Sequence, residues 1–307
     1  MILLAGITSE QALTRVAAEL DRLDAPYTWF DQRQVASTTC SYRIDGGELR
    51  GMLRTGSKTV RLEDVTGVYT RLMDDRFLPE LKGLPPDAPE RVACRGLHDV
   101  FGDWMALAPC RVVNQVEAMA SNSSKPYQAQ LIRAAGFGVP ETLITNQPDL
   151  VRDFLATHGR AVYKSISGTR SIVQELDDEA LARLDDIRWC PVQFQAYVEG
   201  VDVRVHVIGG EVFATRIASA ATDYRYAGVR TGIPARLEAT RLSEAVVQRC
   251  LDLTVRLGLR FSGIDLRITP DDQVVCFEVN PCPAYSYYEG HTGQPIARAV
   301  AHHLAGR

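Results

Sequence analysis

Along this chain, short runs of apolar residues alternate with segments in which apolar residues recur at helix spacing. The first run is Ile2–Ala5, and a second run, "PYTWFD", covers residues 26–31. Between the two runs, apolar residues stand three or four positions apart, as on one face of a helix: Leu13, Val16, Ala17 and Leu20. A strand, a helix and a strand of these lengths predict a βαβ unit, so we expect a parallel sheet in the N-terminal part.

The rest of the pattern mixes helices and strands, which predicts an α/β chain built from α+β subdomains. With 307 residues, the chain is long enough for two or three such subdomains. Strands are predicted at 65–72, just before Asn114, at 160–173 around a loop, at 190–217 with a turn at Gly209-Gly210, and at 262–269 and 273–280 as a hairpin. Helices are predicted at 122–138, 243–259 and 293–304.

Composition excludes several classes of protein. The chain is 46% hydrophobic and 23% charged with a net charge of −4, and its basic residues are scattered, so nucleic acid and anionic membranes are not expected partners. No apolar run approaches the ~20 residues that span a bilayer, and the first residues do not resemble a signal peptide. The 7 cysteines show no zinc-ligand spacing. Free thiols in a reducing cytoplasm are therefore expected.

The predicted hairpin carries polar side chains at one end. Asp265 lies in "SGIDLRI", while Glu278 and Asn280 stand two apart in "CFEVNP", so the latter two share one face of their strand. If the turn is centred near Asp271, Asp265 lies across from Glu278. Such oxygen ligands favour Mg²⁺, or Mn²⁺ in its place. The alternative is a strand face on which these side chains only meet water.

Two further stretches carry charge in apolar surroundings. In "YKSISGTRS", Lys164 precedes a loop of small residues whose backbone N–H groups could approach an anion, although an ordinary hairpin turn explains the loop equally well. In "YVEGVDVRV", Asp202 and Arg204 share one strand face, with Glu199 nearby. These two charged residues either form a salt bridge with each other or serve a phosphate and cation site.

In this order, the motifs resemble the ATP-grasp superfamily. The resemblance runs from about Asn122 to the C-terminus through "NSSKPYQAQLIRAAGFGVPETLITN", "YKSISGTRSIV", "VQFQAYVEGVDVRVHVIGGEVFA", "SGIDLRI" and "CFEVNPCPAYSYYEG". Within the superfamily, the chain is similar to the RimK-like branch, typified by the ligase that adds glutamate to ribosomal protein S6. It is also similar to the microviridin-type peptide-cyclising ligases. "GVYTRL" and "TLITN" are closer to the latter. The N-terminal βαβ unit suits the Rossmann-like pre-ATP-grasp domain of such enzymes.

The resemblance implies a role for each motif. Asp265, Glu278 and Asn280 would hold Mg²⁺, and Arg204, Lys164 and Arg216 would act in catalysis. The residues implied in binding ATP are Lys125, Lys164, Ser167, Gly168, Gln195, Ala196, Tyr197, Val198, Glu199 and Asp202. It also implies three units, 1–113 before the ATP-grasp part, 114–194 with the phosphate loop, and 195–307 with the metal and catalytic residues.

The implied activity is an ADP-forming, ATP- and Mg²⁺-dependent carboxylate–amine ligase working through an acyl phosphate. The substrate would be a peptide or a small molecule such as an amino acid, the location the cytoplasm, and the assembly a homodimer. Two alternatives stay open: a small-molecule kinase that stops at phosphoryl transfer, and a non-catalytic nucleotide-binding protein.

Arginines are the candidates for holding a carboxylate substrate, because the guanidinium group binds a carboxylate bidentately. Arg71, Arg216 and Arg225 are the three candidates, although any one of them could equally be a solvated surface charge. The paired arginines that the S6 ligase carries after its central strand are absent here.

Overall fold

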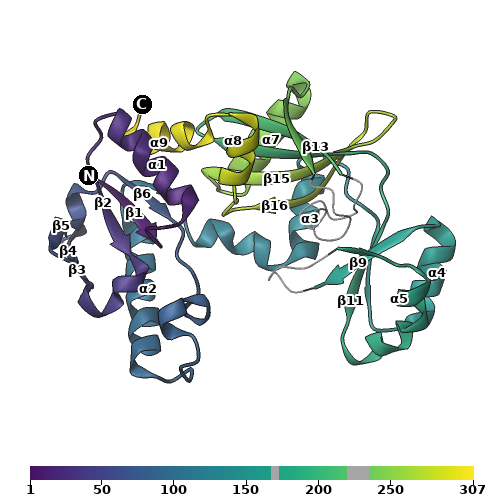
Figure 1. Cartoon of the computed structure of the whole chain (residues 1–307), viewed down its shortest axis with the longest axis horizontal. Coiled ribbons are helices and arrows are strands. Elements are labelled where there is room, and N and C mark those ends of the chain that lie inside the picture. Colours follow the sequence, from purple (N-terminus) through teal and green to yellow (C-terminus); the bar gives the residue numbers. More distant parts are fainter. Residues whose placement is uncertain (167–172, 220–234) are drawn as a thin grey trace.

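The computed structural model describes residues 1–166, 173–219 and 235–307. The predictions made for Ser167, Gly168 and Arg225 therefore lie outside the described residues. The chain forms an N-terminal part, a middle sheet and a large sheet, which Figure 1 shows at the left, the lower right and the upper centre. None of the helices in the described ranges combines the length and the apolar character needed to cross a bilayer. All seven cysteines are free thiols, as predicted.

The N-terminal part contains a four-stranded parallel sheet in the order β2-β1-β6-β7. Its elements are β1 (Ile2–Gly6), α1 (Gln11–Arg22), β2 (Tyr27–Asp31), β6 (Gly67–Thr70) and β7 (Arg111–Val113). Strands β1 and β2 pair in parallel, with α1 between them in sequence, so the predicted βαβ unit is confirmed. The helix buries the apolar face that its spacing predicted, including Leu13 and Val16.

Other N-terminal elements were not predicted. These are the three-stranded antiparallel sheet of β3 (Thr39–Asp45), β4 (Glu48–Thr55) and β5 (Lys58–Arg61), and the helix α2 (Pro89–Leu107). Strand β3 is largely exposed and therefore carries little hydrophobic signal. Helix α2 contains Gly96 and Gly102, which lower helix propensity, although it buries Phe101 and Trp104.

The middle sheet has four strands in the order β10-β9-β11-β8. Its elements are β8 (Thr142–Thr145), β9 (Ala161–Ser165), β10 (Gln174–Glu175) and β11 (Val192–Ala196), with the helices α4 (Pro148–His158) and α5 (Asp178–Ala182). Helix α4 contributes Val151, and strands β9 and β11 contribute Ala161 and Phe194, to one buried cluster. The helices thus occupy one face of this sheet, as Figure 1 shows.

The large sheet has five antiparallel strands in the order β14-β13-β12-β15-β16. The strands are β12 (Val201–Ile208), β13 (Glu211–Ala218), β14 (Arg236–Thr240), β15 (Phe261–Ile268) and β16 (Val274–Asn280). Helices α3 (Lys125–Ala134) and α7 (Glu244–Arg256) cover one face, where Ile132 and Val246 pack against Val203 and Val205. Because side chains alternate along a strand, Asp202, Arg204 and His206 all belong to the other face.

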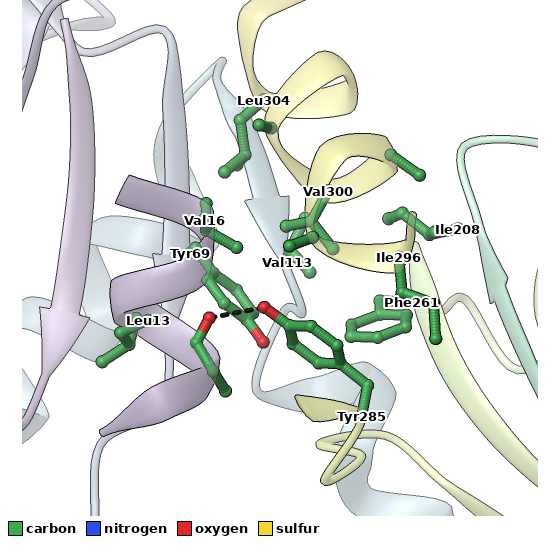
Figure 2. Close-up of a cluster of buried hydrophobic side chains, with 14 of the residues drawn as sticks. Leu13, Val16, Tyr69, Val113, Ile208, Phe261, Tyr285, Ile296, Val300 and Leu304 are labelled. Atoms are coloured by element: carbon green, nitrogen blue, oxygen red, sulfur yellow. Dashed lines mark hydrogen bonds between the residues drawn. The ribbon is translucent and has the colours of Figure 1, made fainter. Parts of the chain in front are cut away.

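A shared core joins the large sheet to the N-terminal sheet. The connecting elements are α8 (Ser286–Thr292) and α9 (Ile296–Ala305). Figure 2 shows Ile296, Val300 and Leu304 of α9 in one buried cluster with Val16 of α1 and Phe261 of β15. The Tyr285 hydroxyl donates to the Ala12 carbonyl over 2.5 Å. The C-terminal helix therefore fixes the N-terminal sheet against the end of the large sheet.

Asn114 makes a second connection between these two parts. This side chain is 3% exposed and follows β7 directly. Its amide donates to Phe261 O over 2.6 Å and to Pro281 O, while its Oδ1 accepts from Arg260 N at 2.7 Å and from Phe261 N at 3.0 Å. One amide thereby binds the start of β15 and the turn that follows β16.

Replacing Asn114 with alanine should therefore destabilise the fold strongly. Backbone groups of residues 260, 261 and 281 would lose their partner, and each buried group left unsatisfied, as at 261 and 281, costs about 1–3 kcal/mol. We expect a loss of roughly 3 kcal/mol or more in the free energy of unfolding, measured from the urea midpoint by circular dichroism. The control is Asn146→Ala, which removes one exposed bond of 3.3 Å to Arg188 O and should change stability by less than about 0.5 kcal/mol. Equal midpoints for the two variants would contradict this role.

Candidate functional site

A cavity of about 120 Å³ lies where the middle sheet faces the polar face of the large sheet. Its lining contains many of the predicted residues, together with several that were not predicted. The lining residues are Val162, Lys164, Val173, Gln195, Ala196, Tyr197, Val198, Asp202, Val203, Ile217, Asp265, Leu266, Arg267, Phe277 and Glu278. Segments far apart in sequence, from β9 to β16, thus converge on one space.

The hairpin of β15 and β16 has the predicted register. Asp265 lies opposite Glu278, and Asn280 lies opposite Gly263, so the two carboxylates and the amide project from one face. The Asn280 Oδ1 atom accepts from Cys282 N over 2.9 Å, which leaves it a second lone pair. The alternative of polar side chains that only meet water is disfavoured, because Asp265 is ion-paired with Arg204 and Glu278 faces that carboxylate across the hairpin. The oxygen donors fit Mg²⁺ or Mn²⁺.

Two amides that sequence reasoning missed hold β16 in place. Gln128 of α3 is 3% exposed, and its side-chain amide exchanges two hydrogen bonds of 2.9 Å with the backbone N and O of Val279. With its amide nitrogen facing the strand, Asn122 lies 3.2 Å from Glu278 Oε1. Gln128 stands four residues before Ile132, on the same helix face, and its role becomes recognisable only once that face is known to be covered.

Arg204 is fixed beside the hairpin. It lies opposite Asp265 across β12 and β15, and the two side chains form an ion pair of 2.7 Å. The Arg204 side chain is 6% exposed, and its guanidinium carbon lies 5.7 Å from the ring centre of Tyr288. Next on the same face is His206, whose pKa is lowered well below its usual value by burial and by the charge of Arg204. The imidazole therefore stays neutral and adds no positive charge here.

Asp202 pairs with Arg267, which sequence reasoning did not single out. The carboxylate lies 2.7 Å from the Arg267 guanidinium, so the predicted alternative of an Asp202–Arg204 salt bridge is wrong. Arg267 also donates to Val198 O over 2.8 Å, and its guanidinium carbon lies 5.1 Å from the ring centre of Phe277. Arg267 stands two residues after Asp265 on β15, and that spacing was the signal available in the sequence.

Of the predicted phosphate contacts within the described residues, Lys164 lines the cavity and Lys125 does not. Lys164 is 7% exposed on β9, opposite Gln193, and lines the cavity. Lys125 is the half-buried first residue of α3 and does not line this cavity. Glu199 is 67% exposed and accepts from Arg160 over 2.7 Å, away from the cavity lining. That placement does not support the predicted ribose contact of Glu199.

Arg71 and Arg216, the two predicted substrate arginines within the described residues, line different cavities. Arg216 lies opposite Val203, so it belongs to the helix-covered face and not to the face of Arg204. This placement does not support its predicted catalytic or substrate role. Arg71 donates to Glu10 over 2.6 Å, to Pro283 O over 3.1 Å and to Cys282 Sγ over 3.2 Å. Its side chain therefore ties β6 to the turn that follows Asn280.

Arg71 also lines a second cavity, of about 620 Å³, between the N-terminal part and the segment that follows β16. Helix α2 contributes His98, Asp99 and Asp103 to this cavity, and Glu117 adds a third carboxylate. Cys282, two residues after Asn280, forms part of the wall. This cavity thus reaches the hairpin end from the N-terminal side.

Comparison with known proteins places these features in context. A family model described as the RimK-like ATP-grasp domain matches residues 122–304. A probable alpha-L-glutamate ligase of Xanthomonas euvesicatoria pv. vesicatoria is 28% identical over 283 residues, which are 85% of this chain and 91% of the relative.

Two solved structures are similar over nearly the whole chain. The macrocyclase MdnC of Microcystis aeruginosa, bound with the precursor peptide MdnA, has a TM-score of 0.82 at 20% identity and covers 100% of this chain and 99% of its own. The ATP-grasp ligase PsnB, complexed with minimal precursor, Mg and ADP, has a TM-score of 0.81 at 25% identity, with coverages of 99% and 96%.

Proposed function

Because the chain belongs to the RimK-like ATP-grasp family, we propose that it joins a carboxylate to an amine on a peptide substrate through an acyl phosphate. The chain has the ATP-grasp fold and is an ADP-forming ligase that uses ATP and Mg²⁺. One observation carries the proposal. Asp265, Glu278 and Lys164 line the same cavity, and Arg204 is ion-paired to the first of them.

Each group at this site has a proposed task. Asp265, Glu278 and Asn280 hold Mg²⁺, which supplies positive charge to the phosphate oxygens of ATP. Lys164 binds the phosphates, together with Ser167 and Gly168 of the predicted phosphate loop and with Lys125 at the start of α3. The end of β11 through Val198 lies along the adenine, with Asp202 and its partner Arg267 toward the ribose.

The reaction follows in two balanced steps. A substrate carboxylate oxygen attacks the γ-phosphorus, its bond to ADP breaks, and an acyl phosphate forms. An amine nitrogen then attacks the acyl carbon, the C–O bond breaks, phosphate leaves, and the nitrogen loses a proton. Arg204 stabilises the negative charge that develops in both steps, because its guanidinium is buried and already oriented by Asp265. No protein nucleophile is needed, since positioning and charge neutralisation supply the catalysis.

The substrate class is proposed from relatives. PsnB is bound to a minimal precursor and MdnC to a precursor peptide, and the Xanthomonas relative is named for glutamate. We therefore propose a peptide as one substrate, and a peptide amine or free L-glutamate as the amine. We also propose units 1–113, 114–194 and 195–307, a homodimer, and a cytoplasmic location where ATP is available. Nucleic acid and membranes are not proposed as partners.

The second cavity is the proposed entry for the acceptor amine. Its wall at Cys282 adjoins Asn280, while Asp99, Asp103 and Glu117 give it a negative lining that attracts an ammonium group before deprotonation. Arg71 lies at the same wall but is already held by Glu10 and Pro283 O. We therefore assign Arg71 to bracing the turn after Asn280, in addition to lining the acceptor cavity.

Replacing both Asp99 and Asp103 with asparagine should raise the KM of the amine about fivefold while leaving the KM of ATP unchanged. Exposed charges contribute roughly 0.2–1 kcal/mol each, and this sets the size of the effect. Salt should reduce the difference between parent and variant, because it screens exposed charges. Steady-state kinetics at two ionic strengths measure both effects. The control is Asp45→Asn, at an exposed position of β3. If the KM of the amine is the same in the variant and in the parent, the amine does not bind in this cavity.

A product screen tests the proposed function. Short acidic peptides, with and without free amino acids, are incubated with ATP and Mg²⁺, and phosphate release is followed together with mass spectrometry. A ligase releases ADP and phosphate only when both acid and amine are present, and the joined product loses the mass of one water. A small-molecule kinase would instead leave a stable product carrying an added phosphoryl group, and a non-catalytic nucleotide-binding protein would consume no ATP.

A further inference from the structure

We propose that Gly263 is a positioning residue for Arg204, because the absence of a side chain at this position makes the space that the guanidinium occupies. The inference rests on the catalytic role proposed above for Arg204. Gly263 touches neither ATP nor the metal in this proposal. It acts by leaving room for the Arg204 guanidinium, and so sets the position of that positive charge.

The register of the large sheet explains why the two residues meet. On β12 and β15, Arg204 lies opposite Asp265 and His206 lies opposite Gly263. A long side chain reaches its diagonal neighbour on the same sheet face. The Arg204 side chain therefore pairs with Asp265 and continues over Gly263. Asn280 lies directly opposite Gly263 on β16, so the guanidinium occupies the sheet position beside the proposed metal ligands.

A methyl group at position 263 would occupy this space. An ideal Cβ there would lie 2.6 Å from Arg204 Cζ, closer still to Arg204 Nη2, and 2.7 Å from Pro283 Cβ. Carbon atoms are normally 3.5–4.0 Å apart at contact, so the guanidinium or the proline must move. Pro283 is less free to move, because its carbonyl oxygen accepts from Arg71 over 3.1 Å. The arginine head is therefore the group that shifts.

This shift should affect activity more than stability. Gly263 lies within a regular strand, so its backbone conformation is one that alanine readily adopts. The contact is with the end of a flexible side chain and not with backbone, so a shift of the guanidinium relieves it with less cost to the fold than a shift of the strand. A displacement of about 1 Å in a catalytic group, by contrast, can slow a reaction about a hundredfold. The two effects can therefore be measured separately.

The experiment is a double-mutant cycle with Gly263→Ala, Arg204→Ala and the double variant. The probe is ADP with Mg²⁺ and aluminium fluoride, which mimics the transferring phosphoryl group and needs no knowledge of the acid. Calorimetry compares its affinity with that of ADP and Mg²⁺ alone. The control is Gly96→Ala, at an exposed helix position where an added Cβ meets nothing within 4 Å. Thermal midpoints are recorded for every variant.

In the parent, aluminium fluoride should tighten ADP binding, and Gly263→Ala should lose about tenfold or more of that tightening while ADP–Mg²⁺ affinity stays within about threefold. The double variant should match Arg204→Ala, because Gly263 acts only through that side chain. Parental affinity in Gly263→Ala, or losses that add in the double variant, would overturn the inference while leaving the proposed function intact. An Arg204→Ala variant indistinguishable from the parent would instead overturn the proposed role of Arg204, and the inference with it.

Discussion

Glu278→Gln should lower turnover by about a thousandfold or more while the fold stays intact. The substitution keeps the shape of the side chain but removes one negative charge from the proposed metal site, and with it much of the charge stabilisation that the bound cation gives to phosphoryl transfer. Without metal, the variant should be as stable as the parent or slightly more stable, because Glu278 faces Asp265 and the two carboxylates repel each other.

Two readouts separate a metal ligand from a structural residue at position 278. Turnover is measured over a range of Mg²⁺ and Mn²⁺ concentrations, and the thermal midpoint is measured with ATP, with and without Mg²⁺. The parent should gain stability from Mg²⁺ with ATP, and Glu278→Gln should lose most of that gain. Glu48→Gln is the matched control, because that glutamate of β4 is 68% exposed, pairs with Arg50 and lies in the N-terminal part. Parental activity in Glu278→Gln, or activity lost to a zinc-selective chelator and restored by zinc, would contradict a magnesium site.

Lys164→Ala should weaken ATP binding about tenfold and lower kcat about a hundredfold. The ammonium group of Lys164 is proposed to meet phosphate oxygens in both the bound and the reacting state, so its loss affects binding and rate together. The side chain is 7% exposed, and a buried charge interacts more strongly than an exposed one. ATP affinity is measured by calorimetry and kcat by phosphate release.

The control for this prediction is Lys58→Ala, at an exposed position of β5. It should leave both ATP affinity and kcat unchanged. If Lys164→Ala had the ATP affinity and the kcat of the parent, Lys164 would have no role in binding ATP or in the reaction. The alternative of an ordinary hairpin turn after Lys164 would then hold. Loss of affinity without loss of kcat would restrict Lys164 to holding ATP.

Local pattern was sufficient to predict the hairpin that carries the proposed metal site. Asp265, Glu278 and Asn280 lie close to one another in sequence, on two strands joined by a short turn, so alternation and turn position predict which side chains meet. The βαβ unit at the N-terminus was predictable for the same reason. Strands β3 to β5 were not, because exposed polar strands leave little periodicity.

The prediction for Arg216 used its position along the chain but not the alternation of side chains along a strand. A two-residue turn at Gly209-Gly210 pairs Ile208 with Glu211, and continuing that register places Thr215 opposite Arg204. Arg216 therefore belongs to the opposite face, which the sequence alone could have indicated. The correct partner of Arg204 is on β15, whose alignment with β12 is a long-range feature that no local pattern fixes.

Asn114 and Gln128 were missed for a different physical reason. Each side chain binds backbone groups more than 140 positions away in the sequence, at residues 260–261 and at Val279. Backbone N–H and C=O groups occur at nearly every residue, so they carry no sequence signal. A buried amide is recognisable only once the helix face or strand end that carries it is known to be covered.

Isotope transfer tests the acyl phosphate. Short acidic peptides and L-glutamate, both with ¹⁸O in their carboxylates, are incubated with ATP and Mg²⁺, and the joined product and the released phosphate are analysed by mass spectrometry. If a carboxylate oxygen attacks the γ-phosphorus and the C–O bond then breaks, each amide formed should be matched by one phosphate carrying one ¹⁸O. Amide formed with phosphate free of ¹⁸O, or a stable phosphorylated product with no amide, would contradict the ligase mechanism.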